Sequence, residues 1–260
     1  MRDGSAAWST AIVWFRRDLR LADQPALVEA VPRARTVVPL FVIDDRLMGA
    51  GAPARRWLLQ RSVAELDASL RARGASLLLR RGSPDSVVVE VARHFDANVV
   101  LATRDVTPFS YRRDRAVAAG LEADGRRLAL RPGLLLAEPE VMLTSSGTPY
   151  GVFTPFWRSL RTAPRRELLS APAHIPVPDG LADASDVQPR DFADPAPPLE
   201  DLMPPGETAA QDRLAAWARE GVVAYGSKRN ELSGAGTSHL GADLHLGTLS
   251  PLQVETAALE

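Results

Sequence analysis

Four charged residues directly follow the first short apolar run of the chain and could bind an anionic ligand. The run at residues 11–15 leads into Arg16, Arg17, Asp18 and Arg20. In an open parallel sheet, ligands bind beyond the carboxyl ends of the strands, where the strand order reverses. The alternative is a solvated turn in which the arginines pair with nearby carboxylates. Neither a Gly-x-Gly-x-x-Gly fingerprint nor a Walker loop follows, so the usual dinucleotide and P-loop sites are not predicted.

A second polar stretch, residues 104–109, follows the apolar run at 98–102. It contains Asp105 and would lie on the other side of the same crevice. Thr107–Pro108 also has the form of a helix start, because proline is favoured at the first helical position. We therefore keep two interpretations of this stretch, a wall of the crevice and an ordinary loop that begins a helix.

The third group of candidate residues lies near the end of the sequence and could hold a phosphate. Tyr225, Lys228 and Arg229 precede a glycine-rich stretch that contains Thr237 and Ser238. Glycines permit a close backbone approach, and hydroxyls beside free N–H groups suit a phosphate or pyrophosphate. The alternative is a capped helix after a flexible loop, with both cations solvated.

The composition excludes several other kinds of chemistry. The 260 residues contain no cysteine, which rules out disulfides, thiolate metal sites, iron–sulfur clusters and cysteine nucleophiles. No two of the 4 histidines have i, i+4 spacing, so no metal site is predicted. With a net charge of -1, nucleic acid could be bound only through a local basic groove. No apolar run suits a membrane span or a signal peptide, and we expect a cytoplasmic protein.

Short apolar runs alternate with helical patterns in the first half of the chain. Runs of this length fit strands that are buried on both faces, as in a parallel sheet. The predicted strands are residues 11–15, 36–43, 75–79, 98–102 and 127–130, and the predicted helices are 23–31, 54–73, 83–95 and 110–123. Right-handed crossovers between them predict an α/β fold with a Rossmann-like, doubly wound, five-stranded parallel sheet.

Proline density divides the chain into three parts. Residues 132–205 hold many of the 21 prolines and cannot form regular helix or a central strand. They predict a long interdomain linker with one structured island at 154–160. We therefore predict an α/β domain at 1–131, the linker at 132–205 and the first helices of an all-α domain at 206–260.

Taken in order, these motifs resemble one family, the DNA photolyases and cryptochromes, which are flavoproteins driven by blue light. Residues 13–23 resemble the N-terminal signature of the family, with Gln24 in place of the common asparagine. The other similar segments are 39–44, 105–108, 113–114, 152–156, 236–240 and 247–251, together with Tyr225 and Arg229. Each piece alone is weak, but the full set is specific and runs from about residue 10 to the end.

The resemblance implies a site for flavin adenine dinucleotide (FAD). Its phosphates would be held by Tyr225, Thr237 and Ser238, with backbone help from His239, Leu240 and Gly241. Gly241 stands where the family usually has serine, and Ala242 where it usually has proline. The glycine removes one hydroxyl that would otherwise contact a phosphate.

The resemblance also implies a DNA contact and an antenna site. Arg229 is similar to a residue that contacts the DNA backbone, to which the planar donor fork of arginine is well suited. Asn230 follows it where aspartate is frequent. An antenna folate or deazaflavin would lie in a crevice near Arg16, Arg17, Asp18, Arg20, Asp44 and Asp105.

The activity implied by the resemblance is light-driven DNA repair as a deoxyribodipyrimidine photo-lyase. In photolyases, excited reduced FAD donates an electron to a pyrimidine dimer flipped out of the DNA, and the electron returns after the bond splits. The flavin-ring contacts and the dimer pocket of the family follow the Ser-Pro that corresponds to Ser250–Pro251. We therefore expect a fragment with no catalytic residue of its own and with weak or absent FAD binding.

Two other functions remain open from the sequence. A cryptochrome-like photoreceptor would use the same scaffold for signalling. A stand-alone α/β nucleotide-binding module would need a glycine-rich loop after the fourth strand, and residues 104–109 lack one. UV-damaged DNA is the partner that the family implies. We expect no membrane or metal partner, and we expect a monomer.

Overall fold

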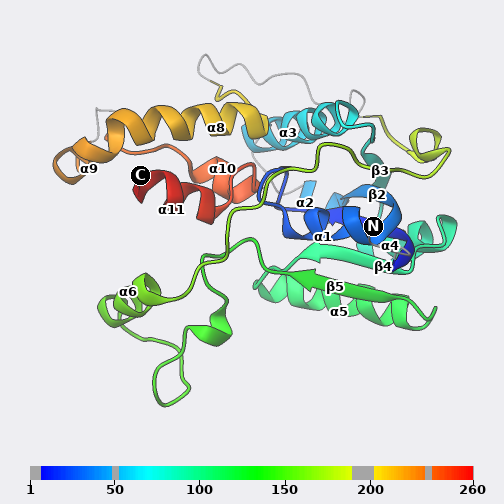
Figure 1. The fold of residues 1–260 in the computed structure, drawn as a ribbon, viewed down its shortest axis with the longest axis horizontal. Coiled ribbons are helices and arrows are strands. Elements are labelled where there is room, and N and C mark those ends of the chain that lie inside the picture. The colour runs from blue at the N-terminus through cyan, green and yellow to red at the C-terminus, as the bar shows by residue number, and fades with distance from the viewer. Residues whose placement is uncertain (1–6, 49–52, 189–201, 232–235, 260) are drawn as a thin grey trace, which may run out of the picture.

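A five-stranded parallel sheet forms the centre of the first half of the chain (Figure 1). The computed structural model describes residues 7–48, 53–188, 202–231 and 236–259. The strands are β1 (Trp8–Phe15), β2 (Ala34–Ile43), β3 (Leu78–Arg81), β4 (Val99–Thr103) and β5 (Arg127–Arg131). Their order is β3-β2-β1-β4-β5, and every neighbouring pair is parallel. The predicted α/β class is thus confirmed, and the strand order reverses at β1 and β4.

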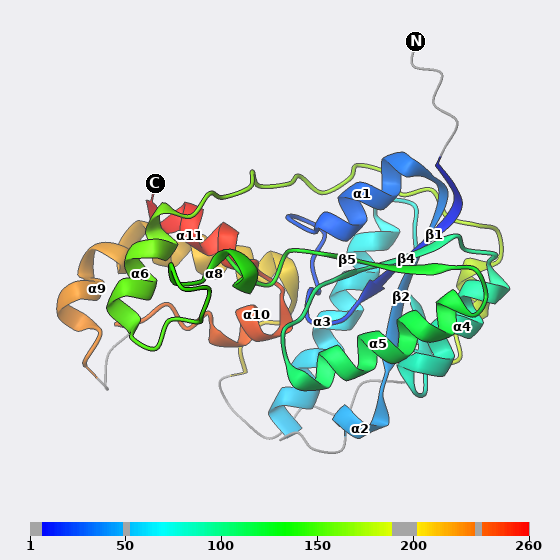
Figure 2. The same cartoon turned by 90° about the horizontal axis from the view of Figure 1, so that it is seen from below.

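Helices cover both faces of this sheet (Figure 2). One face carries α1 (Pro25–Arg33) and α3 (Pro53–Arg71), and the other carries α4 (Pro84–His94) and α5 (Pro108–Glu122). Successive residues of a strand point to opposite faces. Val13 and Phe15 therefore join the core beneath α1 and α3, while Ile12 and Trp14 join the core beneath α4 and α5. This two-sided burial explains why the strands appear as continuous apolar runs.

The third strand begins later than the prediction of residues 75–79. After α3, the amide of Ala75 donates to the Leu70 carbonyl and closes the helix end. The Leu77 amide donates to the buried carboxylate of Asp67 on α3 at 2.8 Å. Residues 75–77 therefore belong to the turn after α3, and pairing with β2 starts at Leu78. A side chain from the preceding helix sets this boundary, and apolar pattern does not record such a contact.

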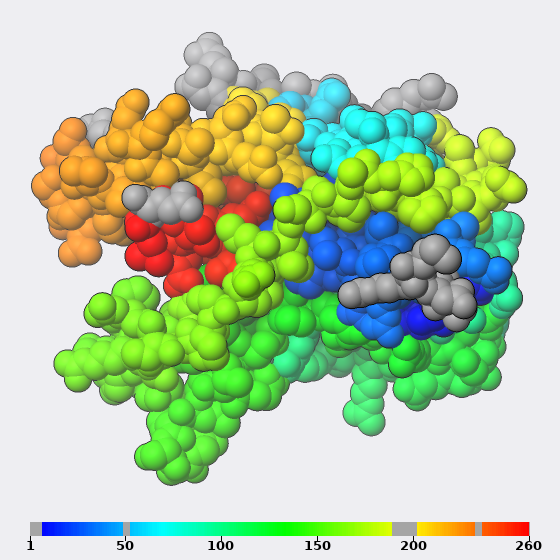
Figure 3. All heavy atoms as spheres, viewed as in Figure 1, coloured from blue at the N-terminus to red at the C-terminus, as the bar shows by residue number. Residues whose placement is uncertain are grey.

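Residues after β5 form a projecting lobe and then a strap along the α/β domain. The lobe contains the one-turn helix η1 (Pro139–Val141) and α6 (Phe153–Thr162), and it stands out in green at the lower left of Figure 3. The strap then carries Ile175 into the core beneath α1 and α3, where its side chain is fully buried. The Ile175 amide donates to the Arg73 carbonyl just after the end of α3. The one-turn helix η2 (Leu181–Ala184) follows. Residues 189–201 of the predicted linker lie outside the described ranges.

The one-turn helix α2 (Asp45–Met48) follows β2, and the remaining helices come after the strap. They are α8 (Gly206–Ala216), a π-helical turn η3 (Trp217–Gly221), α9 (Val222–Lys228), α10 (Gly241–Leu246) and α11 (Pro251–Leu259). α8 lies beside α3 (Figure 1). A small apolar core joins α8 to the residues around α10 and α11 through Leu214, Leu240 and Leu249. None of the helices within the described ranges has the length and apolarity needed to cross a bilayer.

Candidate functional site

Asp18 occupies the point where the strand order reverses, and its carboxylate is filled with internal hydrogen bonds. The residue is fully buried. Its Oδ1 accepts from the Arg16 amide at 2.6 Å. Its Oδ2 accepts from Gln24 Nε2 and from Thr103 Oγ1, each at 2.5 Å. Asp18 therefore ties the end of β1 to the start of α1 and to the end of β4, with both carboxylate oxygens bonded internally and away from solvent.

Arg16 is also bonded internally. Its guanidinium donates to the Thr103 carbonyl and to Asp114 of α5. It lies over the buried ring of Trp14, 4.7 Å from the centroid. Burial and the neighbouring charge of Arg113 lower the pKa of Arg16, and the carboxylates of Asp114 and Asp18 oppose that shift. Arg16 therefore stabilises the crevice floor rather than facing solvent.

The other acidic residues predicted for the crevice stabilise its rim. Asp44 binds the guanidinium of Arg46 through two hydrogen bonds of 2.8 and 2.7 Å. Asp105 accepts from Ser110 Oγ at 2.8 Å and from the Thr107 amide at 3.2 Å. Burial opposes ionisation of Asp105, but these hydrogen bonds lower its pKa overall. The helix-start interpretation of residues 104–109 is confirmed, because the Thr107 side chain caps α5.

Arg17 is the one exposed member of the six predicted crevice residues. Its side chain is 42% exposed and lies 3.7 Å from Asp105. Arg20, by contrast, is fully buried and bonds only backbone carbonyls. The structure thus brings all six residues to the carboxyl end of β1, β2 and β4, but it leaves only Arg17 accessible.

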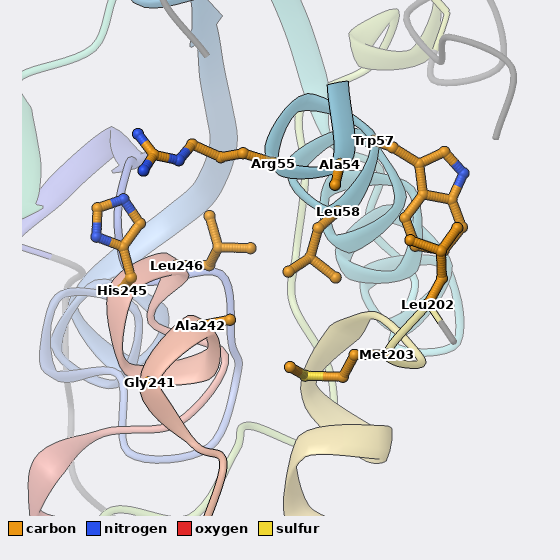
Figure 4. Close-up of a pocket in the computed structure, with 10 residues that line it drawn as sticks. All are labelled: Ala54, Arg55, Trp57, Leu58, Leu202, Met203, Gly241, Ala242, His245 and Leu246. Carbon is orange, nitrogen blue, oxygen red and sulfur yellow. The ribbon is translucent and has the colours of Figure 1, made fainter. Parts of the chain in front are cut away.

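A cavity of about 470 Å³ lies beside Arg17, between α3 and α10 (Figure 4). Its lining residues are Ala54, Arg55, Trp57, Leu58, Leu202, Met203, Gly241, Ala242, His245 and Leu246. Arg55 and His245 lie together at one end of it, and Arg17 Nε donates to the His245 carbonyl at 3.0 Å. Sequence reasoning assigned no role to Arg55 or His245, because no local pattern shows that residues 54–58 face residues 241–246.

His245 provides a test of the electrostatics of this cavity. Burial lowers the pKa of His245 below its usual 6.5, and the positive charges of Arg17 and Arg55 lower it further. We expect Arg55→Gln to raise the pKa of His245, measured by an NMR pH titration of its ring. Arg61→Gln, on the same helix, is the matched control and should leave the titration unchanged. If the pKa of His245 were the same in both variants, the proximity of Arg55 to His245 would be contradicted.

The same shift has a consequence for stability. Because the folded-state pKa of His245 lies below its unfolded value, protonation favours the unfolded chain. The contribution of His245 to stability is therefore present above about pH 6.5 and is lost as the pH falls through the folded pKa.

The residues predicted to hold FAD phosphates lie on α9 and on the loop before α10. Thr237 and His239 are exposed, Ser238 is half-buried and Leu240 is buried. A Cβ added to Gly236 would meet the Lys228 carbonyl at 2.2 Å, so the loop backs directly onto the end of α9. This contact brings the start of the loop that contains Thr237 and Ser238 to the end of the helix that carries Tyr225.

Tyr225 and Arg229 lie one helical turn apart at the exposed end of α9. The Tyr225 side chain is 41% exposed, and its ring meets Trp217 edge-on at 6.4 Å. The Arg229 amide donates to the Tyr225 carbonyl, and the Arg229 side chain is exposed. Gly241 is the first residue of α10 and also lines the cavity. Among the described residues, no group of His, Asp or Glu side chains could hold a metal ion.

Comparison with known proteins identifies the class. The family model for DNA photolyase matches residues 11–178. The photo-lyase of Streptomyces griseus is 35% identical over 263 residues, which is 97% of this chain and 56% of the relative. The photo-lyase of a Synechococcus species is 32% identical over 262 residues, which is 95% of this chain and 53% of the relative. The chain belongs to the DNA photolyase family, as its motifs predicted.

Solved structures show the same class. A bacterial class III photolyase from Agrobacterium tumefaciens superposes with a TM-score of 0.85 at 30% identity, over 98% of this chain and 54% of the neighbour. A Synechocystis cryptochrome gives a TM-score of 0.83 at 27% identity, over 95% of this chain and 54% of the neighbour. The chain thus spans about half the length of these relatives. An uncharacterised 31.6 kDa protein of another Synechococcus strain is nearer in length, at 34% identity with 92% and 85% covered.

Proposed function

We propose that this chain is the antenna domain, the interdomain linker and the first flavin-domain helices of a deoxyribodipyrimidine photo-lyase, which repairs UV-induced pyrimidine dimers in DNA with blue light. The observation that carries the proposal is the similarity at 32–35% identity over nearly the whole chain to proteins named for that activity. Because those relatives are about twice as long, we propose that repair needs further flavin-domain helices. The three-part division at residues 131 and 205 is part of this proposal.

The surface of α6 supports the need for further helices. Within α6 no residue is buried. Phe153 is 72% exposed and Trp157 is 45% exposed, and their rings stack with centroids 6.3 Å apart. An apolar groove of about 480 Å³, partly lined by Phe156 and Leu160, lies on the same lobe. Contiguous exposed apolar surface of this kind marks a protein contact. A helical flavin domain would cover it.

The loop before α10 supports a phosphate contact with FAD. Tyr225, Thr237, Ser238, His239, Leu240 and Gly241 are the residues that we propose would hold the cofactor. The close approach of Gly236 to Lys228, the exposed Thr237 and the half-buried Ser238, whose Oγ accepts from the Leu240 amide at 3.5 Å, fit a phosphate group. When bound and reduced, FAD would supply the electron that splits the dimer. The exposed guanidinium of Arg229 would bind a DNA phosphate.

The cavity between α3 and α10 supports a second chromophore site. Its walls are largely apolar, and its two titratable side chains, Arg55 and His245, lie together at the end next to Arg17. Ligand pockets commonly combine an apolar lining with a few convergent polar groups. We propose that an anionic antenna, a folate or a deazaflavin, would occupy this cavity at the rim of the predicted crevice.

A chimera tests the proposed repair activity. The chain would be fused to the part of the Streptomyces griseus photo-lyase that it does not match, and the product would be assayed on an oligonucleotide containing a pyrimidine dimer. We expect repair under blue light and none in the dark. The unfused chain should bind FAD weakly, because the apolar ring pocket would come from the fused half. A chimera that binds FAD stoichiometrically but leaves dimers intact would instead favour a cryptochrome-like photoreceptor.

A further inference from the structure

The carbonyls of the last two residues of α10 and of its C-cap, Gly247, are all bonded by the segment that follows β1. The bonds run from Arg17 Nε to His245 O (3.0 Å), from Leu19 N to Leu246 O (3.2 Å) and from Arg20 Nη1 to Gly247 O (3.0 Å). A helix leaves its final carbonyls without partners inside the helix, and they carry partial negative charge. Two arginines and one amide supply the missing donors, and we call Arg17, Leu19 and Arg20 the α10 clamp.

Arg20 connects this clamp to two further segments. Its Nε and Nη2 both donate to the Asp23 carbonyl, at 3.2 and 3.0 Å, and Nη2 also donates to the Gly133 carbonyl at 3.0 Å. Burial lowers the pKa of Arg20, and the carboxylates of Asp18, Asp23 and Glu207 oppose that shift. Arginine stays protonated in proteins, and its planar fork can hold several carbonyls in fixed directions. A lysine ammonium has no such fork.

The helix that the clamp holds is too short to fix its own position. α10 has 6 residues, and helices of this length have little stability apart from their contacts. Its side chains Ala242, His245 and Leu246 form one wall of the α3–α10 cavity, and Leu240 and Gly241 begin the helix. The orientation of that wall therefore depends on contacts from outside the helix. They are the bonds to its C-terminal end and the ion pair of Asp243 with Arg213 of α8 at 2.7 Å.

We propose that Arg20 is a positioning residue that fixes α10, and with it His245 and the α10 wall of the cavity. Arg20 is buried and does not line the α3–α10 cavity, so it acts on that cavity through the Gly247 carbonyl. Its relevance to cofactor binding rests on the proposed function. Its effect on α10 does not, because that effect can be measured without a ligand.

The test compares Arg20→Met and Arg20→Lys with the wild-type chain and with Arg166→Met. Arg166 is the matched control, because it pairs with the Asp23 carboxylate and makes no bond to α10. Amide hydrogen exchange would be followed at Leu244 and Thr248, which bond within this segment. We expect exchange there about tenfold faster in Arg20→Met, consistent with the loss of a hydrogen bond to a charged group.

The His245 titration gives a readout that loss of global stability would not move. If α10 shifts away from Arg17 and Arg55, the pKa of His245 should return toward 6.5 in Arg20→Met and partly so in Arg20→Lys. The proposal would be overturned by a folded Arg20→Met chain in which amide exchange and the pKa of His245 are those of the wild type. If Arg20→Met does not fold, the same two measurements on Arg20→Lys decide the question. FAD binding is measured separately. Absence of binding by the wild-type chimera would contradict the proposed function and leave the clamp result intact.

Discussion

Asp18→Ala is expected to destabilise the chain by about 3–5 kcal/mol, the range for removing one partner from a buried charged network. The substitution leaves the Arg16 amide, Gln24 Nε2 and Thr103 Oγ1 without their buried acceptor. It also removes a negative charge that favours protonation of both Arg16 and Arg20 inside the protein. Urea unfolding followed by circular dichroism would measure the free energy of unfolding.

Two control variants separate the causes of this loss. Asp18→Asn keeps the volume and one acceptor but removes the charge, so we expect an intermediate loss of stability. Asp45→Ala removes an exposed carboxylate that pairs with Arg81 at 3.3 Å, and it should cost less than about 1 kcal/mol. A similarly small loss for Asp18→Ala would contradict the proposed role of Asp18, which is to hold the ends of β1 and β4 and the start of α1 together.

The sheet could be predicted from sequence because its burial is two-sided. Residues 11–15 and 98–102 are apolar at every position that the core needs, and that pattern requires no knowledge of distant segments. The same reasoning placed the third strand too early, because it could not see Asp67 bonding the Leu77 amide. Boundaries that depend on one tertiary hydrogen bond leave no periodic signal.

The crevice was harder to predict, because its structure also depends on contacts between residues that are far apart in the sequence. The cluster of charges after β1 identified the region correctly as the carboxyl edge of the sheet, where Arg17 is exposed. It did not indicate that Arg20 would be buried against Gly133 and Gly247, whose positions lie more than 100 residues away in sequence. Arg55 and His245 lie close together only because α10 faces α3 across the cavity, so their shared site has no local signature in the sequence.

Gly247→Ala should displace α10 from the segment after β1. Gly247 has a φ of +71°, and an added Cβ would lie 1.9 Å from the Arg17 carbonyl oxygen and 2.6 Å from Asp18 Cα. These atoms belong to backbone that Asp18 holds in place, so they cannot move aside cheaply. Left-handed strain costs about 1–2 kcal/mol, and the backbone clash adds about 1–3 kcal/mol. We expect a loss of about 3 kcal/mol in the free energy of unfolding.

Gly125→Ala is the matched control for this substitution. Gly125 has nearly the same φ, +70°, but nothing lies within 4 Å of an added Cβ. It should therefore show the left-handed strain alone, about 1 kcal/mol. The difference between the two variants measures the clash with the segment after β1. Equal losses would mean that this segment yields to the added methyl group, and that α10 is held less tightly than its three capped carbonyls indicate.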